Sequence, residues 1–179
     1  MLNKKGRNMH AKGPYHDLIR DYKHPKDSEA GRRVALETLK TWSDAIEAKD
    51  LDTLRKVMDE NIVIELPFNE SGKTDKESYR IYRGMEACLN FWATAFKAEG
   101  TMHPSSEMEL TVSPDGGRMF IEKRAHLTMS NGRTYRNRYV LRYDIKDGRM
   151  VHVKEYYNPI QSAYAFGRPV AGKIMIDEL

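Results

Sequence analysis

Two glycine-containing turns between long alternating segments constrain this chain more than any other feature. The turns are Ser130-Asn131-Gly132 and Lys146-Asp147-Gly148, and glycine supplies the positive φ that a tight hairpin requires. Polar and apolar residues alternate around both turns, from Gly117 to Pro159. The sequence therefore predicts a meander of three long antiparallel strands.

The register of this meander decides which side chains share a face, because a shift of one residue moves every side chain to the opposite face. A two-residue turn at Asp147-Gly148 would mix polar and apolar side chains, whereas a three-residue loop with a left-handed glycine separates them. We therefore favour the three-residue loop, which gives these pairs: Tyr143 with Val151, Leu141 with Val153, and Tyr139 with Glu155. The first turn, treated in the same way, gives these pairs: Ile121 with Leu141, Lys123 with Tyr139, Ala125 with Asn137, and Leu127 with Tyr135.

In this register one face is mostly apolar but carries a row of polar groups, Lys123, Tyr139 and Glu155, across three neighbouring strands. Asn137 and Tyr157 fall in the next row. An apolar concave wall with a few convergent polar groups is typical of a small-molecule site. We therefore predict that this face lines a pocket for a hydrophobic small molecule.

Composition favours one soluble domain. The chain has 179 residues, of which 40% are hydrophobic and 31% charged, and no apolar run approaches the length of a membrane span. The first thirty residues lack the apolar segment of a signal peptide, so we expect a cytoplasmic protein without a membrane partner. The single cysteine, Cys88, excludes an intramolecular disulfide and is expected to be a packing residue.

The net charge of +4 raises the question of nucleic-acid binding. The basic residues are spread along the chain rather than gathered in one block, and no zinc-finger, phosphate-loop or RNA-binding motif is present. Nucleic acid is therefore a disfavoured partner. The sequence also offers no metal-binding or cofactor-binding motif, so we expect neither a metal nor a cofactor.

Apolar residues at helical spacing predict two long helices. The first follows the N-cap residue Ser28 and runs to about Ala48, with Trp42 on its buried stripe as a core or pocket-lid residue. The second runs from Gly84 to about residue 98, with Trp92 on its stripe. Phe91 lies beside that stripe, where it either approaches the ligand or widens the stripe. Asp50 caps a short helix between the two long ones.

The remaining segments predict shorter strands at 61–68, 79–83 and 107–113, and a turn of helix at 160–166. Glu65 lies between Ile64 and Leu66 in the first of these strands, so it is a second candidate acid or base unless it points to solvent. The order of elements is typical of an α+β fold with helices packed on one face of a curved sheet. We expect an N-terminal flexible arm at 1–27, one domain at 28–167 and a C-terminal tail at 168–179.

This pattern resembles the nuclear transport factor 2-like superfamily, whose fold is a cone-shaped, cystatin-like α+β barrel with an antiparallel or mixed sheet on N-terminal helices. The strand at 61–68, the Tyr82-Arg83-Gly84 segment and the Lys146-Asp147-Gly148-Arg149 turn are similar to its SnoaL-like branch. The last strand, Lys154-Glu155-Tyr156-Tyr157-Asn158-Pro159, is similar to that of the phenazine biosynthesis A/B proteins. The resemblance covers roughly residues 29–166.

The resemblance implies a set of possible activities. Members of the superfamily include ketosteroid isomerases, polyketide cyclases, dehydratases, epoxide hydrolases and non-catalytic binding modules. Glu155 matches an acidic residue that the phenazine proteins use in acid/base chemistry, whereas the histidine of those proteins falls near Phe91 here. Members commonly form dimers through the convex face of the sheet, so we expect a homodimer through the face that carries Arg136, Arg138, Arg142 and Lys154.

We therefore expect a cofactor-independent acid/base enzyme, an isomerase, cyclase or dehydratase acting on a hydrophobic carbonyl-containing or polycyclic molecule. Its catalytic residues are expected to be Glu155 as proton shuttle, Tyr139 as hydrogen-bond donor and Lys123 as an orienting charge. Substrate contacts are expected from Asn137, Tyr157, Tyr135, Trp42, Phe91, Trp92 and Glu65. The alternative is a non-catalytic ligand-binding or dimerisation module, in which Lys123 would hold Glu155 in a buried ion pair.

Overall fold

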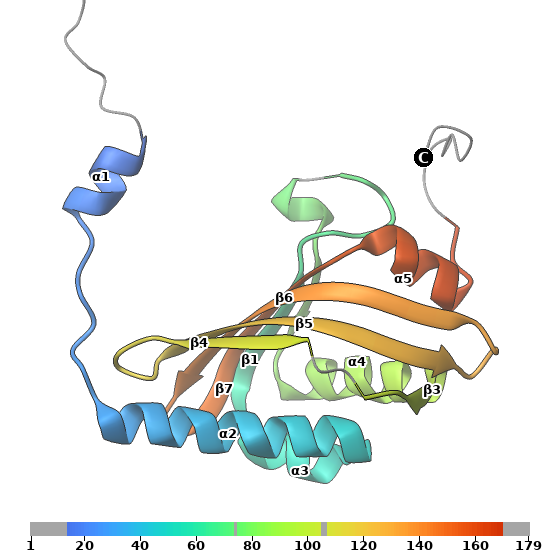
Figure 1. Cartoon of the computed structure of the whole chain (residues 1–179), viewed down its shortest axis with the longest axis horizontal. Helices are drawn as coiled ribbons and strands as arrows, with labels where there is room; N and C mark the ends of the chain where they lie inside the picture. The colour runs from blue at the N-terminus through green and yellow to red at the C-terminus, as the bar shows by residue number, and fades with distance from the viewer. Residues whose placement is uncertain (1–13, 74, 105–106, 170–179) are drawn as a thin grey trace, which may run out of the picture.

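The structure is a computed structural model that describes residues 14–73, 75–104 and 107–169. One curved, unclosed sheet of seven strands carries helices on its concave face (Figure 1). The helices are α1 (Pro14–Arg20), α2 (Glu29–Ala48), α3 (Leu51–Val57), the 3-10 helix η1 (Lys76–Ser78), α4 (Met85–Ala98) and α5 (Pro159–Phe166). The strands are β1 (Met58–Leu66), β2 (Arg80–Arg83), β3 (Glu99–Met102), β4 (Met108–Val112), β5 (Arg118–Met129), β6 (Thr134–Lys146) and β7 (Arg149–Tyr157).

The N-terminal helices α2 and α3 begin at the predicted caps. The Ser28 side chain accepts a hydrogen bond from the Gly31 amide at 2.9 Å, and the Asp50 side chain accepts bonds from the first turn of α3. These caps satisfy amide groups that have no partner within the helix. On α2, Ala35 and Trp42 are buried at the predicted spacing, so the apolar stripe holds α2 against the sheet.

The first helix, α1, lies in the segment for which the sequence predicted only a flexible arm. It stands apart from the body of the molecule (Figure 1) and leaves Tyr15, Leu18 and Ile19 exposed. Residues 1–13 of the predicted arm and 170–179 of the predicted tail lie outside the described residues. None of the helices in the described part of the chain combines the length and the apolar character needed to cross a bilayer.

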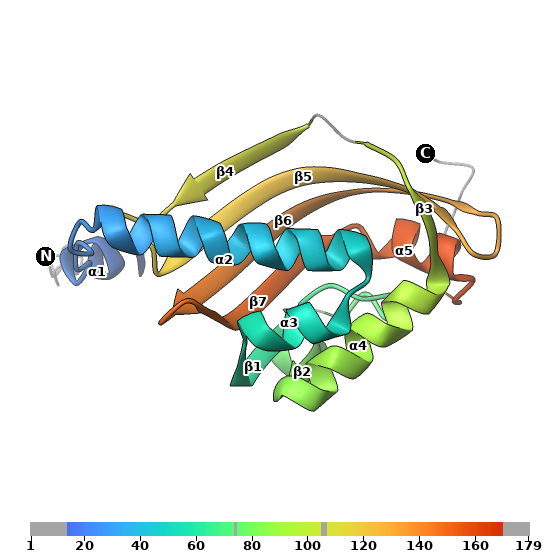
Figure 2. The same ribbon diagram turned by 90° about the horizontal axis from the view of Figure 1, so that it is seen from below.

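Helix α4 follows Gly84 as predicted and buries one side. Its buried residues are Cys88, Leu89, Trp92 and Phe96. Burial raises the pKa of the Cys88 thiol to about 11, so this cysteine is a packing residue rather than a thiolate nucleophile. Figure 2 shows α2, α3 and α4 side by side across the concave face of the sheet.

The sheet is mixed. Its strand order is β2-β1-β7-β6-β5-β3, with β4 also paired to β5. The β1–β7 pair is parallel and the other pairs are antiparallel. Strand β3 was not predicted, because the sequence around it suggested a loop. The core between this sheet and the helices includes Leu54, Met58, Ile62, Ile64, Met119, Met150 and Val153.

The predicted register of β5 and β6 is confirmed. Ile121 pairs with Leu141, Lys123 with Tyr139, Ala125 with Asn137, and Leu127 with Tyr135. Since side chains alternate along a strand, Lys123 and Tyr139 lie side by side on the concave face. The first glycine turn and the polar alternation of its strands were therefore sufficient to place this half of the meander.

The predicted register of β6 and β7 was wrong by two residues. The turn contains only Asp147 and Gly148, both with positive φ (50° and 71°), as in a two-residue type I′ hairpin. A register shift between Asp144 and Ile145 follows, because β7 contributes one additional residue there. The pairs beyond this bulge are Tyr143 with Val153, Leu141 with Glu155, and Tyr139 with Tyr157.

Beyond the bulge, the error leaves the faces of the sheet unchanged, whereas next to the turn Met150 takes the buried position predicted for Val151. A shift of two residues preserves the alternation of side chains, so Glu155 still points to the concave face. It lies in the row of Ile121 and Leu141, whereas Tyr157 joins the row of Lys123 and Tyr139. Lys123, Tyr139 and Glu155, which were predicted in one row, therefore lie in two neighbouring rows of the concave face.

Candidate active site

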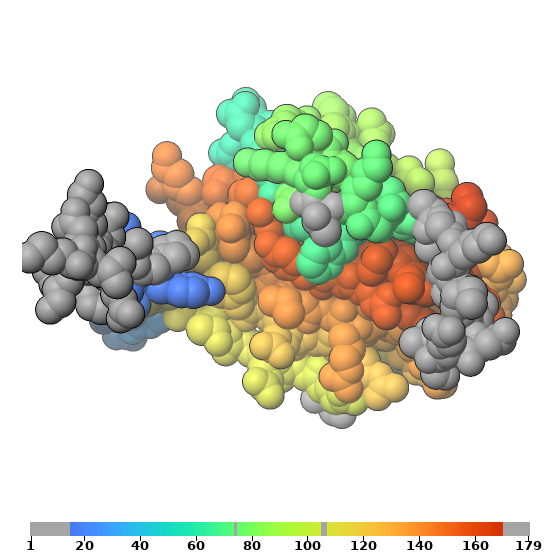
Figure 3. Space-filling model, turned by 90° about the horizontal axis from the view of Figure 1, so that it is seen from above, coloured from blue at the N-terminus to red at the C-terminus, as the bar shows by residue number. Residues whose placement is uncertain are grey.

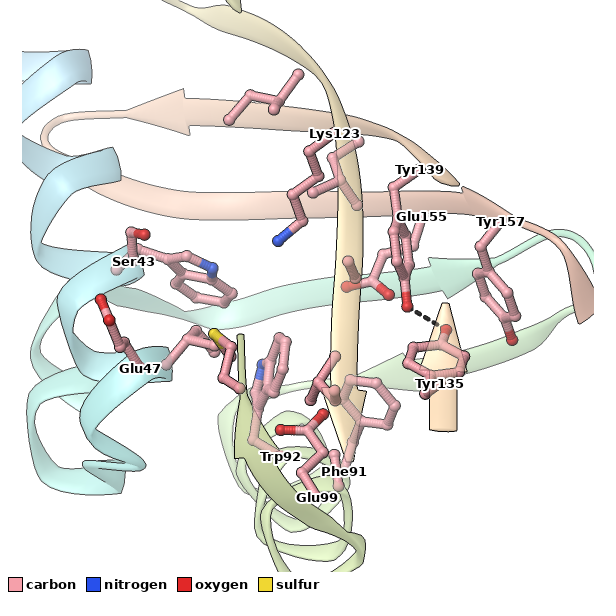
Figure 4. A pocket seen from close by; sticks show the side chains of 18 of the residues that line it. Ser43, Glu47, Phe91, Trp92, Glu99, Lys123, Tyr135, Tyr139, Glu155 and Tyr157 are labelled. Atoms are coloured by element: carbon pink, nitrogen blue, oxygen red, sulfur yellow. Dashed lines mark hydrogen bonds between the residues drawn. The ribbon is translucent and has the colours of Figure 1, made fainter. Parts of the chain in front are cut away.

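A cavity of about 1280 Å³ lies between the concave face of the sheet and helices α2 and α4. Strands β5, β6 and β7 form one wall, and the two helices form the other (Figure 4). Eight of the ten residues predicted to form the site line this cavity: Trp42, Phe91, Trp92, Lys123, Tyr135, Tyr139, Glu155 and Tyr157. The curvature of the sheet and the apolar stripes of the helices thus build this pocket.

Aromatic rings form much of the pocket wall. Trp42 on α2 and Trp92 on α4 meet edge to face at 5.9 Å between ring centroids, and Phe91 contacts Trp92 at 5.1 Å. On the opposite wall, the rings of Tyr139 and Tyr157 lie 5.7 Å apart. The tryptophan and phenylalanine contacts are edge to face, a favourable geometry for aromatic pairs. The pocket therefore offers flat apolar surfaces to a ring-containing ligand.

Glu155 is half-buried on β7 and has no hydrogen-bond or ion-pair partner among the described residues. Burial raises the pKa of its carboxyl group to about 7, with Lys123 opposing the shift and Glu99 adding to it. A carboxyl group with this pKa exchanges a proton readily near neutral pH. Because its oxygens face the cavity, Glu155 can act on a bound molecule.

Lys123 projects into the same cavity from β5 (Figure 4). Its Nζ atom lies 5.8 Å from the centroid of the Tyr139 ring. In the described part of the chain no carboxylate oxygen lies within 4.0 Å of this ammonium group. Lys123 and Glu155 therefore do not form the buried ion pair that was expected of a non-catalytic module.

The hydroxyl groups of Tyr135 and Tyr139 share a hydrogen bond in the pocket. Burial raises the pKa of both phenols, so both remain protonated near neutral pH. Burial also raises the pKa of Tyr157 to about 12, and the Tyr157 hydroxyl accepts a hydrogen bond from Arg80 at 3.3 Å. The cavity thus contains neutral hydroxyl donors close to the Glu155 carboxyl group.

The structure places Asn137 outside the cavity wall, because its amide is used within the protein. Its Nδ2 atom donates to the Tyr135 hydroxyl and to the Asn158 carbonyl, both at 2.9 Å. Its Oδ1 atom accepts from the backbone amides of Arg138 and Asn158. Asn137 is 4% exposed, so it holds Tyr135 in position and has no remaining group for a ligand.

Glu65 also lies away from the cavity. Its carboxylate is 2.8 Å from the Lys154 ammonium group and 3.6 Å from His152, both of which neighbour it on the parallel strand β7. Burial alone would raise the pKa of Glu65, but the hydrogen bond and charge of Lys154 outweigh burial and lower it. Glu65 therefore remains ionised in a structural ion pair, unlike the Glu155 carboxyl group.

A second carboxyl group in the cavity, Glu99, was missed in the sequence. It is half-buried where α4 joins β3, and burial raises its pKa against the opposing charges of Lys49 and Lys123. The signal was present, since Glu99 continues the stripe of Trp92 and Phe96 at helical spacing. An acidic residue on an otherwise apolar stripe marks a group that faces the interior.

No metal-binding arrangement was found in the described ranges: no three His, Cys, Asp or Glu side chains are grouped there to hold an ion. The interior of the pocket carries several ionisable groups. They include the Glu155 and Glu99 carboxyl groups, whose pKa is raised, the Lys123 ammonium group and the tyrosine hydroxyls. Together they can accept, donate and stabilise protons and negative charge on a bound molecule.

A curved mixed sheet that encloses an apolar cavity against N-terminal helices defines the cone-shaped class of nuclear transport factor 2-like proteins. Within this class, the model of the SnoaL-like domain matches residues 39–153 of the chain. The protein belongs to the SnoaL-like domain family, as the resemblance indicated.

The comparisons with individual proteins agree with this family. The chain is 28% identical over 137 residues to the uncharacterized protein YesE of Bacillus subtilis strain 168, which covers 74% of this chain and 87% of that protein. A candidate isomerase from Bacillus subtilis has a similar structure, with 23% identity, a TM-score of 0.66, and coverage of 79% of this chain and 99% of that one. A phenazine biosynthesis-related protein from Pseudomonas aeruginosa is 17% identical, with a TM-score of 0.63 and coverage of 89% and 98%. At these identities the structural likeness shows the fold alone.

Proposed function

We propose that the protein is a cofactor-independent acid/base enzyme, an isomerase, cyclase or dehydratase, acting on a hydrophobic carbonyl-containing or polycyclic molecule. One observation carries this proposal. Glu155 faces an apolar cavity without a partner among the described residues, and burial raises its pKa to about 7. Enzymes place a general base or acid in such surroundings, because proton transfer is most efficient when the pKa is near the working pH.

The proposed chemistry begins with the ionised Glu155 carboxylate. It removes a proton from a carbon next to the substrate carbonyl group, and negative charge moves to the carbonyl oxygen. The Tyr135–Tyr139 pair has one hydroxyl hydrogen left after its mutual hydrogen bond, and that hydrogen stabilises the developing oxyanion. Glu155 then returns the proton to a different carbon, which completes an isomerisation with no net gain or loss of protons.

Other lining residues fit the same proposal. Trp42, Phe91 and Trp92 offer apolar faces to the rings of the substrate, and Tyr157 extends that surface on the opposite wall. Structural neighbours described as a candidate isomerase, a candidate polyketide cyclase and an epoxide hydrolase share the fold. Their descriptions support a class of small-molecule chemistry, whereas the choice of Glu155 rests on this pocket.

A ligand and turnover screen tests the proposal. Thermal shift and mass spectrometry would compare wild type, Glu155→Gln and Glu65→Gln against aromatic, steroid-like and polyketide-like carbonyl compounds. We expect at least one compound to bind all three proteins and to be converted by wild type and Glu65→Gln but not by Glu155→Gln. Binding without conversion by any of the proteins would instead indicate a non-catalytic ligand-binding module.

A further inference from the structure

The absence of an ion-pair partner among the described residues sets Lys123 apart from the other half-buried cations of the fold. Arg80 lies 2.5 Å from Glu70, Arg142 lies 2.9 Å from Asp144, and Lys154 lies 2.8 Å from Glu65. Lys123 has no such carboxylate within 4.0 Å in the described ranges, although it too is half-buried. An ammonium group in this position is costly unless an anion or several acceptors surround it.

The surroundings of the Lys123 ammonium group leave one side open to an anion. On the concave face its strand neighbours are Ile121 and Ala125, and across β6 it meets the ring of Tyr139. Its Nζ atom points into open cavity space between the sheet and the helices (Figure 4). The direction left open is therefore the one from which a ligand arrives.

We propose that the cavity selects ligands that combine an aromatic or polycyclic body with a carboxylate or similar anionic oxygen, and that Lys123 receives this anion. The aromatic wall holds the body of the ligand, and the ammonium group pairs with the charge at one side of it. This inference deepens the proposed function and rests on it only in treating the cavity as the ligand site.

The two carboxyl groups in the cavity are compatible with an anionic ligand. Burial raises the pKa of both Glu155 and Glu99, with Lys123 opposing each shift. A bound anion pairs with Lys123 and disfavours further negative charge nearby, which favours the protonated form of Glu99, the carboxyl group that does not act as the base. A protonated carboxyl group is also a hydrogen-bond donor to the second oxygen of the ligand anion.

Matched neutral and anionic probes test this selectivity directly. Equilibrium dialysis at pH 7 would measure the affinity of 2-naphthoate and of 2-naphthamide, which share shape and differ in charge. We expect wild type to bind 2-naphthoate ten- to a hundredfold more tightly, as a charge-assisted contact withdrawn from water provides. Lys123→Met and Lys123→Gln should both lose the preference while they retain binding of 2-naphthamide.

The control variant is Lys40→Met. Lys40 also borders the cavity and carries the same charge, but it is exposed and lies 2.6 Å from Asp44 on its own helix. This variant should keep the full preference. Equal affinity of wild type for the two probes, or a preference that survives both Lys123 substitutions, would overturn the inference even if the enzyme proposal holds.

Discussion

The side-chain hydroxyl groups of Tyr135 and Tyr139 share a hydrogen bond although the two residues are four positions apart on one strand. Four residues of extended strand span roughly 13 Å, so two parallel side chains would not meet. The concave bend of β6 leans the two rings toward each other inside the cavity (Figure 4). Asn137, which lies between them in the sequence, donates a hydrogen bond from its Nδ2 atom to the Tyr135 hydroxyl oxygen at 2.9 Å.

This arrangement predicts that the two tyrosines act as one unit. Removal of either hydroxyl, in Tyr135→Phe or Tyr139→Phe, should lower kcat by about 10- to 1000-fold with little change in KM, as expected for an oxyanion donor. The double variant should cost little more than either single one. Tyr164→Phe, whose ring is 59% exposed on α5, serves as the control. Additive losses would contradict the shared hydrogen bond.

Glu155 should make stability depend on pH. Its pKa in the folded protein is about 7, above the ordinary value of 4.5. Between pH 4.5 and pH 7 the folded state therefore keeps a proton that the unfolded chain has released. This contribution to stability is present below pH 4.5 and is lost as the pH rises through 7. At pH 8, Glu155→Gln should therefore be more stable than wild type by about 1–3 kcal/mol.

Urea unfolding at pH 5 and pH 8 would measure this effect. The difference in unfolding free energy between Glu155→Gln and wild type should grow from the lower to the higher pH. Glu47→Gln, at an exposed position of α2 that also borders the cavity, should follow wild type at both values. A Glu155→Gln protein that shows the same pH dependence as wild type would mean that the folded carboxyl group titrates normally.

Glu65 should behave in the opposite way. The charge of Lys154 lowers its pKa despite burial, so its contribution to stability is present above the unfolded pKa and is lost as the pH falls. Glu65→Gln leaves Lys154 without its partner and should reduce the unfolding free energy by about 3 kcal/mol at pH 7. Ligand affinity and turnover should not change. A loss of turnover without a loss of stability would place Glu65 in the site after all.

We also propose that the outer face of the sheet pairs with a second copy of the chain. Figure 3 shows this face, where side chains of β4, β5 and β6 reach the surface. Phe120 and Val140 are 41% and 40% exposed there, and Glu122 lies beside Val140 where a two-fold axis could bring it to Arg138. Exposed apolar groups flanked by complementary charges suit a self-complementary interface.

Sedimentation at micromolar concentration tests this pairing. Wild type should sediment as a dimer, with twice the chain mass of 20.8 kDa, and Val140→Glu should sediment as a monomer. Ile160→Glu, which places the same charge at an exposed position of α5, should remain dimeric. A monomeric wild type would contradict the proposed interface.

Much of the fold followed from local signals in the sequence. The caps at Ser28 and Asp50, the apolar stripes of α2 and α4, and the β5–β6 register depend on neighbours within one or two elements. They were therefore predictable from spacing. The β6–β7 register was not, because the bulge opposite Asp144 depends on how the bent strands fit together. The residue types give no mark of the additional residue, Val151, which the register between β6 and β7 skips.

The same distinction applies to the site. Glu155 could be placed on the concave face because a two-residue error preserves alternation, and eight of the ten expected residues line the cavity. Asn137 and Glu65 do not line it, because Asn137 is bonded to Asn158 and Glu65 to Lys154. These partners come from distant parts of the chain, so the sequence pattern did not predict them. Glu99 could have been predicted, because it is an acidic residue on an apolar helical stripe. The pairing of a buried polar group is thus harder to predict than the face on which it lies.

Titration of the Glu155 carboxyl group by NMR tests the central claim most directly. The carboxyl carbons of glutamate-labelled protein would be followed from pH 3 to pH 9, with Glu155 and Glu99 assigned from the spectra of Glu155→Gln and Glu99→Gln. The account predicts a midpoint near pH 7 for Glu155. A midpoint near the ordinary value of 4.5 would show that the carboxyl group is well solvated or paired, and would contradict its role as proton shuttle.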